Sequence, residues 1–97
     1  MAHYVVAHIT VNAEDRDTFA ALLSEHVRLS LEGDGCEAFD VRQDVSDRCK
    51  LVYVERYSNK AAFDRHIGSP RVTAFLSETQ RFLSRPADFA EYDEFRP

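Results

Sequence analysis

The chain has little of what a nucleic-acid-binding or membrane protein needs. Its 12 lysines and arginines are outnumbered by 17 aspartates and glutamates, which gives a formal net charge of −5. A negative surface disfavours binding to phosphate backbones and to anionic lipids. No apolar run approaches the roughly 20 residues that span a bilayer. We therefore expect neither a nucleic-acid nor a membrane partner. The absence of a basic and then apolar N-terminal segment predicts a cytoplasmic protein.

Cysteine, glycine and tryptophan are also scarce. Cys36 and Cys49 are expected at opposite ends of a predicted hairpin, too far apart for a disulfide, and neither has the spacing of a zinc ligand. The sequence contains no glycine-rich phosphate loop, nucleotide fingerprint, nucleophile elbow or histidine–carboxylate metal motif. We therefore expect no bound cofactor and no metal site.

The rest of the composition is that of an ordinary globular protein, and 97 residues with 44% hydrophobic content fit a single domain spanning 1–97. Residues 3–11 alternate between apolar and polar side chains, which predicts a strand. Asn12 is then expected to cap a helix, and the glycines in 33–35 are expected to end it. Its predicted buried stripe recurs at i, i+3, i+4, i+7 and i+8. The stripe consists of Phe19, Leu22, Leu23, His26 and Val27.

Two further strands are predicted at 36–45 and 49–57, because the polar connection 46–48 is short enough for an antiparallel hairpin. Ser58 or Asn59 is expected to cap a short helix. Pro70 suits the first turn of the next helix, which Pro86 closes, and residues 88–95 alternate again as a last strand. The apolar sides of these two helices carry Ala62, Phe63, His66, Ile67, Val72, Phe75, Leu76, Thr79, Phe82 and Leu83.

This order, β-α-β-β-α-α-β, predicts an α+β fold in which a four-stranded antiparallel sheet has its helices on one face. The opposite face is expected to carry Val52 and Val54, with Phe89 and Phe95 from the last strand. Such a face is too apolar for water. We therefore expect a homodimer formed through the sheet.

Four segments follow one another as a strand, a second strand, a short helix and the proline-led start of another helix, with a tight turn between the two strands. They are Phe39-Asp-Val-Arg-Gln-Asp44, Leu51-Val-Tyr-Val-Glu-Arg-Tyr57, Ala62-Phe-Asp-Arg-His66 and Ser69-Pro70. In this order they resemble the antibiotic biosynthesis monooxygenase (ABM) family, whose ferredoxin-like domains form dimeric α+β barrels. Ser24-Glu-His26-Val, followed by Ser30 and Leu31, is similar to the small autoinducer-2 processing isomerases of that superfamily.

Two histidines are the candidate catalytic residues. His26 lies on the buried stripe of the first helix, and His66 lies on the apolar side of the short helix. An imidazole with a reference pKa of about 6.5 suits proton abstraction near neutrality. Either residue could instead be a packed histidine bonded to a backbone group. Family members often have another histidine after the serine–proline pair, where this chain has Arg71.

The predicted substrate pocket uses one face of strand 49–57. Alternation places every second side chain there, and the row resembles the family's aromatic-x-Glu-x-aromatic strand. The alternative is that the tyrosines are core and Glu55 pairs with a positive charge. Because a four-stranded sheet has one helix-covered face, we expect His26 and His66 in one cavity with Tyr53 or Tyr57 in its wall. The predicted substrate-binding residues are Phe39, Leu51, Tyr53, Glu55, Tyr57 and Phe63.

The resemblance implies cofactor-free oxygenation of a quinol or polyphenol by molecular oxygen, started by deprotonation of a substrate hydroxyl in a dry apolar pocket. Two alternatives stay open. One is an isomerase of a small keto or phosphorylated sugar-like compound, whose phosphate would need Arg42, Arg56 or Arg71. The other is a non-catalytic dimeric module that binds a small molecule. Haem-degrading relatives typically have a first-strand asparagine and a tryptophan near the pocket. This chain has neither, which disfavours haem.

Overall fold

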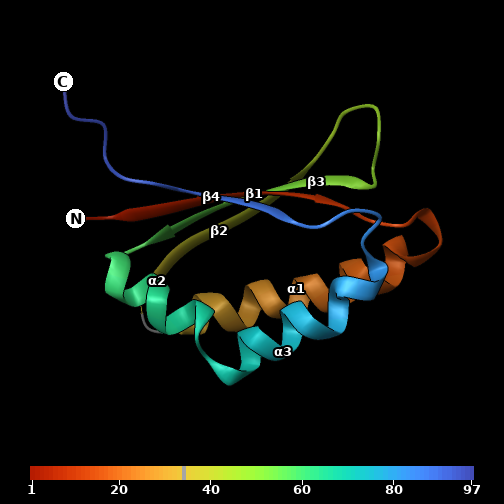
Figure 1. Ribbon diagram of the computed structural model, residues 1–97, viewed down its shortest axis with the longest axis horizontal. Helices are drawn as coiled ribbons and strands as arrows, with labels where there is room; N and C mark the ends of the chain where they lie inside the picture. Colours follow the sequence, from red (N-terminus) through yellow and green to blue (C-terminus); the bar gives the residue numbers. More distant parts are fainter. Residues whose placement is uncertain (34) are drawn as a thin grey trace.

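The computed structural model describes residues 1–33 and 35–97 and contains one sheet covered on one side by helices (Figure 1). The order of the helices and strands along the chain is the predicted one, with two additional 3-10 turns. The elements are β1 (His3–Thr10), η1 (Ala13–Asp15), α1 (Arg16–Glu32), β2 (Cys36–Gln43), β3 (Lys50–Tyr57), α2 (Lys60–Ile67), α3 (Pro70–Thr79), η2 (Gln80–Phe82) and β4 (Asp88–Tyr92).

The sheet has the strand order β2-β3-β1-β4, and every neighbouring pair is antiparallel. The predicted four-stranded antiparallel sheet with helices on one face is confirmed. In β1 the residues facing the helices are Val5, Ala7 and Ile9, all buried. Leu51, Tyr53, Glu55 and Tyr57 continue that buried face on β3. The core therefore lies between this face and the helices.

The helix ends follow local chemistry. The Asn59 side chain accepts a hydrogen bond from the Ala62 amide at the start of α2, and Ser69 does the same for the Val72 amide at the start of α3, where Pro70 takes the first position. Gly33 forms the C-cap of α1. Asp34, which was expected to belong to the same stop signal, lies outside the described residues. Within those residues, no helix is long and apolar enough to cross a membrane.

Several details differ from the sequence expectation. The Asn12 side chain makes no capping bond at the 3-10 turn that precedes α1, and its amide nitrogen donates instead to the Asp15 carboxylate and the Arg81 carbonyl. Leu22 is 43% exposed, because the buried face of α1 is narrower than the apolar stripe predicted from the sequence. Phe89 pairs with Ala7 and so points to the helix-covered face, not to the opposite one. Phe95 lies beyond the end of β4, where it is 87% exposed. The predicted strands 3–11, 36–45, 49–57 and 88–95 are each one to three residues too long.

Candidate active site

A small cavity lies between the sheet and the helices, with a volume of about 20 Å³, enough for about one water molecule. Its wall combines apolar side chains with four polar ones from three elements. The polar residues are His26 from α1, Tyr53 and Glu55 from β3, and His66 from α2. The structure thus brings both candidate histidines to one place. The apolar wall consists of Val5, Phe39, Phe63, Ile67, Val72, Phe75, Leu76 and Phe89.

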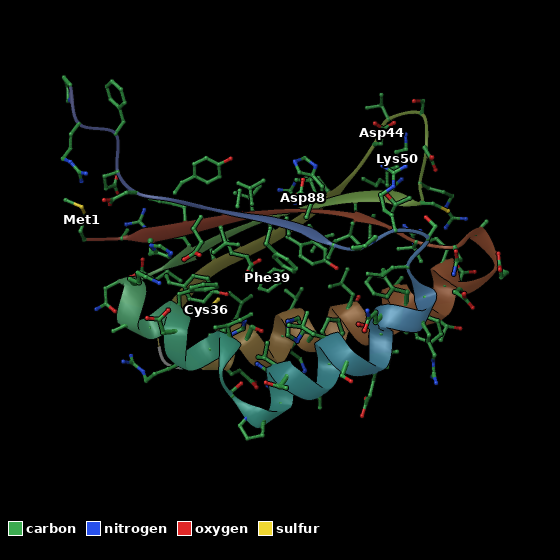
Figure 2. All side chains as sticks on the ribbon, in the orientation of Figure 1. Met1, Cys36, Phe39, Asp44, Lys50 and Asp88 are labelled. Atoms are coloured by element: carbon green, nitrogen blue, oxygen red, sulfur yellow. The ribbon has the colours of Figure 1, made fainter. Side chains whose placement is uncertain are left out.

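Local sequence patterns explain how these side chains arrive there. Alternation along β3 turns Tyr53 and Glu55 toward the helices. The helical period of α1 places His26 one turn after buried Leu23, and His26 itself is 5% exposed. The Asn59 cap fixes the start of α2, which sets His66 above the end of β3. Figure 2 shows Phe39 pointing from the sheet into the space between the two layers.

Aromatic packing holds the His26 ring. Phe75 stacks on it with centroids 3.9 Å apart and ring planes 7° apart, and Phe39 meets it edge-on at 5.6 Å. His66 lies 6.0 Å away and also packs against the Tyr57 ring at 5.2 Å. Burial lowers the pKa of both histidines to about 4, and the nearby Arg71 charge acts in the same direction. Both imidazoles are therefore neutral at pH 7.

Glu55 is the buried acid of the site. One of its oxygens, Oε1, accepts a hydrogen bond of 2.5 Å from the Tyr57 hydroxyl. Burial raises the pKa of Glu55 to about 7, although the Tyr57 hydrogen bond opposes this rise. The pKa values of the Tyr53 and Tyr57 hydroxyls are raised by burial and by the Glu55 charge. A carboxyl group near half-ionisation at neutral pH can accept and return a proton.

Several polar atoms of this wall have no protein hydrogen-bond partner among the described residues. They are the Tyr53 hydroxyl, Nε2 of His26, Oε2 of Glu55 and both ring nitrogens of His66. The same residues contain no fully buried side-chain nitrogen or oxygen that lacks a partner. These atoms therefore keep accessible surface, and they remain available to a bound molecule. Among the described residues, Glu55 has no positively charged partner of the kind that the alternative interpretation required, and its hydrogen bond comes from the neutral Tyr57 hydroxyl.

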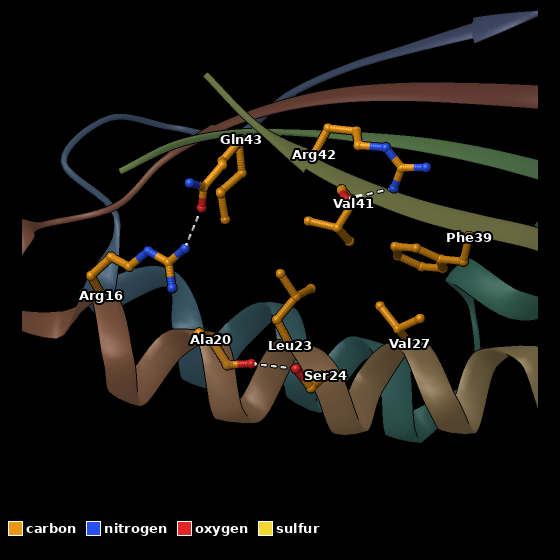
Figure 3. Close-up of a pocket in the computed structure, with 10 residues that line it drawn as sticks. Arg16, Ala20, Leu23, Ser24, Val27, Phe39, Val41, Arg42 and Gln43 are labelled. Atoms are coloured by element: carbon orange, nitrogen blue, oxygen red, sulfur yellow. Dashed lines mark hydrogen bonds between the residues drawn. The ribbon is translucent and has the colours of Figure 1, made fainter. Parts of the chain in front are cut away.

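The other predicted pocket residues lie at different distances from the cavity. Phe63 lines the cavity. Tyr57 does not line it but contacts two residues that do, Glu55 and His66. Leu51 belongs instead to a larger pocket of about 620 Å³ between α1 and β2, shown in Figure 3. Phe39 lines both spaces. At the far end of the larger pocket, Arg16 donates a hydrogen bond to Gln43.

Another pocket adjoins the cavity on the side of α3 and β4, with a volume of about 320 Å³. It shares four residues with the cavity wall: Tyr53, Phe75, Leu76 and Phe89. From the sequence, Phe75 and Leu76 were expected only on an apolar helical stripe, and Phe89 was wrongly expected on the sheet face away from the helices. The strand register that brings Phe89 beside Ala7 is a tertiary feature without a local signal.

No pattern in the sequence indicated where Arg71 lies. It lies at the start of α3 and reaches across to α1, where it contacts His26 and Ser30. Forty-five residues separate Arg71 from His26, so no short motif could have linked them. In the described part of the chain, no group of three or more histidine, cysteine or acidic side chains is arranged to hold a metal ion.

A four-stranded antiparallel sheet with helices on one face, and with a small cavity of apolar and polar side chains between the two layers, defines a ferredoxin-like α+β protein. The sequence profile of the antibiotic biosynthesis monooxygenase family matches residues 2–78. The chain belongs to that family, as the sequence resemblance indicated.

Known proteins show the same relationship. The chain is 30% identical over 82 residues to Rv0793 of Mycobacterium tuberculosis, named provisionally as a monooxygenase, and the match covers 84% of this chain and 80% of that protein. The solved Rv0793 structure superposes with a TM-score of 0.90, covering 100% of this chain and 98% of the other at 25% identity. A conserved protein from Methanosarcina mazei Go1 has a TM-score of 0.92 at 22% identity, covering 98% and 94%, which shows the fold alone.

Proposed function

We propose that the protein is a cofactor-independent monooxygenase that oxidises a quinol or polyphenol-like molecule with molecular oxygen. The observation that carries this proposal is Glu55. Its carboxyl group lies in an apolar cavity with a pKa of about 7, and its oxygen Oε2 has no protein partner in the described chain. A general base is most effective when its pKa lies near the working pH. We therefore assign the base role to Glu55, beside the two histidines.

The reaction begins with proton transfer from a substrate hydroxyl to Glu55. The O–H bond of the substrate breaks and a carboxyl O–H bond forms, which leaves an electron-rich phenolate. The phenolate is the form that gives electrons to oxygen. For a simple quinol, one oxygen atom enters the ring and the other leaves as water, giving a hydroxyquinone. Quinol and oxygen together supply all the atoms and electrons of these two products.

The cavity of about 20 Å³ cannot hold an aromatic ring, but the adjoining pocket of about 320 Å³ can. We place the ring in this pocket, between Phe75 and Phe89, with its reacting hydroxyl toward Tyr53 and Glu55. A ring bound against this largely apolar wall would displace water, which strengthens the electrostatic interactions inside and protects a reactive intermediate from hydrolysis.

The test is oxygen uptake with a panel of quinols and no added cofactor. Wild type should consume oxygen and yield the hydroxylated quinone, and Glu55→Gln should lower kcat by roughly 10²–10⁴-fold because the base is lost. Glu78→Gln is the matched control, since Glu78 is exposed on α3, and it should keep full activity. Full activity of Glu55→Gln would contradict the base assignment, and no uptake with any quinol would contradict the reaction.

One observation favours an isomerase of a phosphorylated keto compound as a second candidate. A pocket of about 430 Å³ shares His66 with the cavity and is lined by Arg65, Arg71 and Ser69, with no carboxylate among its lining residues. Arg42 and Arg56 do not serve this purpose, because they lie near Asp40 and Glu37 on exposed surfaces. Isomerisation of a keto-sugar phosphate without oxygen uptake would favour this function. Ligand binding without either turnover would favour a binding module.

We also propose that the protein works as a cytoplasmic homodimer. Cys36 and Cys49 are both free, which is typical of a reducing compartment. The sheet face opposite the helices carries partly exposed apolar side chains, including Val54 at 43%, and burying it against a second copy would remove them from water.

A further inference from the structure

Arg71 makes two contacts with α1 that are unusual for an arginine. Its Nη1 lies 3.1 Å from Nδ1 of His26, and its Nη2 donates to the Ser30 hydroxyl at 3.3 Å. A guanidinium has five N–H donors, no acceptor, and does not lose its proton in proteins. In this contact Nδ1 of His26 must therefore be the acceptor. A neutral imidazole that accepts at Nδ1 carries its proton on Nε2.

The neighbouring side chains hold the His26 ring in this orientation. Phe75 stacks on one face of His26 and Phe39 packs on its edge. Ser30, the second partner of Arg71, is 1% exposed and stands one helical turn from His26. A flipped ring would place a carbon atom against the guanidinium and lose the hydrogen bond. The other titratable side chains of the same cavity are His66, 6.0 Å from the His26 ring and neutral at pH 7, and Tyr53 and Glu55 on β3.

We propose that Arg71 is a positioning residue that holds His26 as an Nε2–H hydrogen-bond donor, so that His26 binds an oxyanion of the substrate instead of removing a proton. The identity of that oxyanion, a phenolate, rests on the proposed function. The hydrogen on Nε2 leaves no lone pair for a substrate proton, so the base must be elsewhere. Within the described residues, Nε2 has no protein partner and keeps accessible surface.

The arrangement favours an anion for an electrostatic reason. The Arg71 guanidinium polarises the imidazole from its far side, and hydrogen bonds to charged partners are the stronger ones. No carboxylate contacts Arg71 among the residues that the structure describes, so its charge acts on the site. Glu55 lies on the opposite, β3 side of the cavity with the Tyr53 and Tyr57 hydroxyls. The cavity thus has a proton acceptor on the sheet and an anion-binding donor on the helices.

The first test is the tautomer of His26, measured by two-bond ¹⁵N–¹H correlation at pH 7 on the intact protein. Wild type should show protonated Nε2 and unprotonated Nδ1. Arg71→Met removes the donors and keeps an apolar stem, so the two tautomers should become mixed. Arg71→Lys keeps a donor and should restore the Nε2–H form, while Arg48→Met, at an exposed arginine that pairs with Asp17, is the control and should leave the tautomer unchanged. Protonated Nδ1 in wild type, or an unchanged tautomer in Arg71→Met, would overturn the proposal.

The second test measures anion binding without turnover, so it stands if the protein oxidises no quinol. Ionised 4-nitrophenol and its uncharged methyl ether, 4-nitroanisole, are compared by titration. Wild type should bind the phenolate at least about 10-fold more tightly than the ether, since a hydrogen bond to a charged group contributes roughly 1.5–3 kcal/mol. Arg71→Met should lose this preference and Arg71→Lys should retain part of it. Equal affinity of wild type for both compounds would contradict the oxyanion role.

Discussion

The ionisable side chains of the cavity respond to burial in opposite directions. Burial raises the pKa of Glu55 from its ordinary value of 4.5 to about 7 and lowers that of His26 and His66 from 6.5 to about 4. Each shift favours the neutral form in an apolar environment. At neutral pH the site therefore contains two neutral imidazoles, a carboxyl group near half-ionisation and two protonated tyrosines. Such a set can move a proton without creating several buried charges at once.

These shifts predict how stability depends on pH. Between about pH 4.5 and 7 the unfolded chain releases the Glu55 proton while the folded chain keeps it, so this group makes the protein less stable as pH rises. The histidines act in the opposite sense, because the unfolded chain gains their protons below about pH 6.5. Glu55→Gln removes only the first effect. Relative to wild type, the free energy of unfolding of the variant should therefore rise by roughly 1–3 kcal/mol between pH 5 and pH 8.

Urea unfolding at a series of pH values measures this difference. The Glu78→Gln protein is the control for replacing a carboxyl group by an amide, because Glu78 is exposed on α3. If the difference between Glu55→Gln and wild type stays flat across this range, Glu55 titrates in the folded protein as it does in water.

At the scale of elements, the position of α2 depends on how closely the helix packs against Gly35. This glycine has φ of +88°, in the left-handed region, and a Cβ atom built on it would lie 2.5 Å from the Ala62 Cβ. Ala62 is completely buried in α2. The same helix carries His66 to the cavity. A single turn before β2 therefore sets the distance between α2 and the sheet.

Gly35→Ala should destabilise the fold by roughly 2–4 kcal/mol, because it combines an unfavourable backbone conformation with a clash against α2. Gly33→Ala is the matched substitution: its φ is −79° and the nearest atom to the added carbon is the Ser30 carbonyl oxygen at 3.3 Å. Gly33→Ala should therefore destabilise the fold less than Gly35→Ala does. Thermal and urea unfolding compare the stabilities of the two variants. If both lose the same free energy of unfolding, the close packing of α2 is not the reason that position 35 requires glycine.

At the scale of the whole molecule, the sheet has one open face (Figure 1), because all three α-helices lie on the other side. Most of its apolar side chains come from the adjacent strands β3, β1 and β4, and charged side chains such as Arg56 flank them. The register places Val6 between Val54 and Ala90 at the centre of this face. The apolar residues that β1, β3 and β4 place on this face are Tyr4, Val6, Val52, Val54, Ala90 and Tyr92, and β2 adds Ala38 opposite Arg56.

Val54→Glu should convert the expected homodimer into a monomer, since a buried unpaired carboxylate would face the second copy. Sedimentation equilibrium at micromolar concentration should give twice the chain mass for wild type and the single mass for the variant. Val45→Glu is the control, because Val45 is fully exposed between β2 and β3, and it should leave the dimer intact. A wild-type protein that sediments as a monomer would contradict the proposed dimer interface on this face.

The sequence by itself determined the elements and their order. Alternation on 49–57 placed Tyr53 and Glu55 on one face, and the stripe containing Phe19, Leu23 and His26 identified the buried side of α1. Such patterns are readable because one face of an element must be buried and the period of each element is fixed. The family followed from the same segments, and the profile match over 2–78 bears it out.

Tertiary structure alone decided which side chains meet. The register of β4 turned Phe89 into the site, and the crossing of α3 over α1 brought Arg71 to His26 across 45 residues. The pKa of Glu55 depends on how much of its surroundings is apolar, which no local pattern encodes. Long-range packing therefore set the chemistry of groups that the sequence could only place on a face.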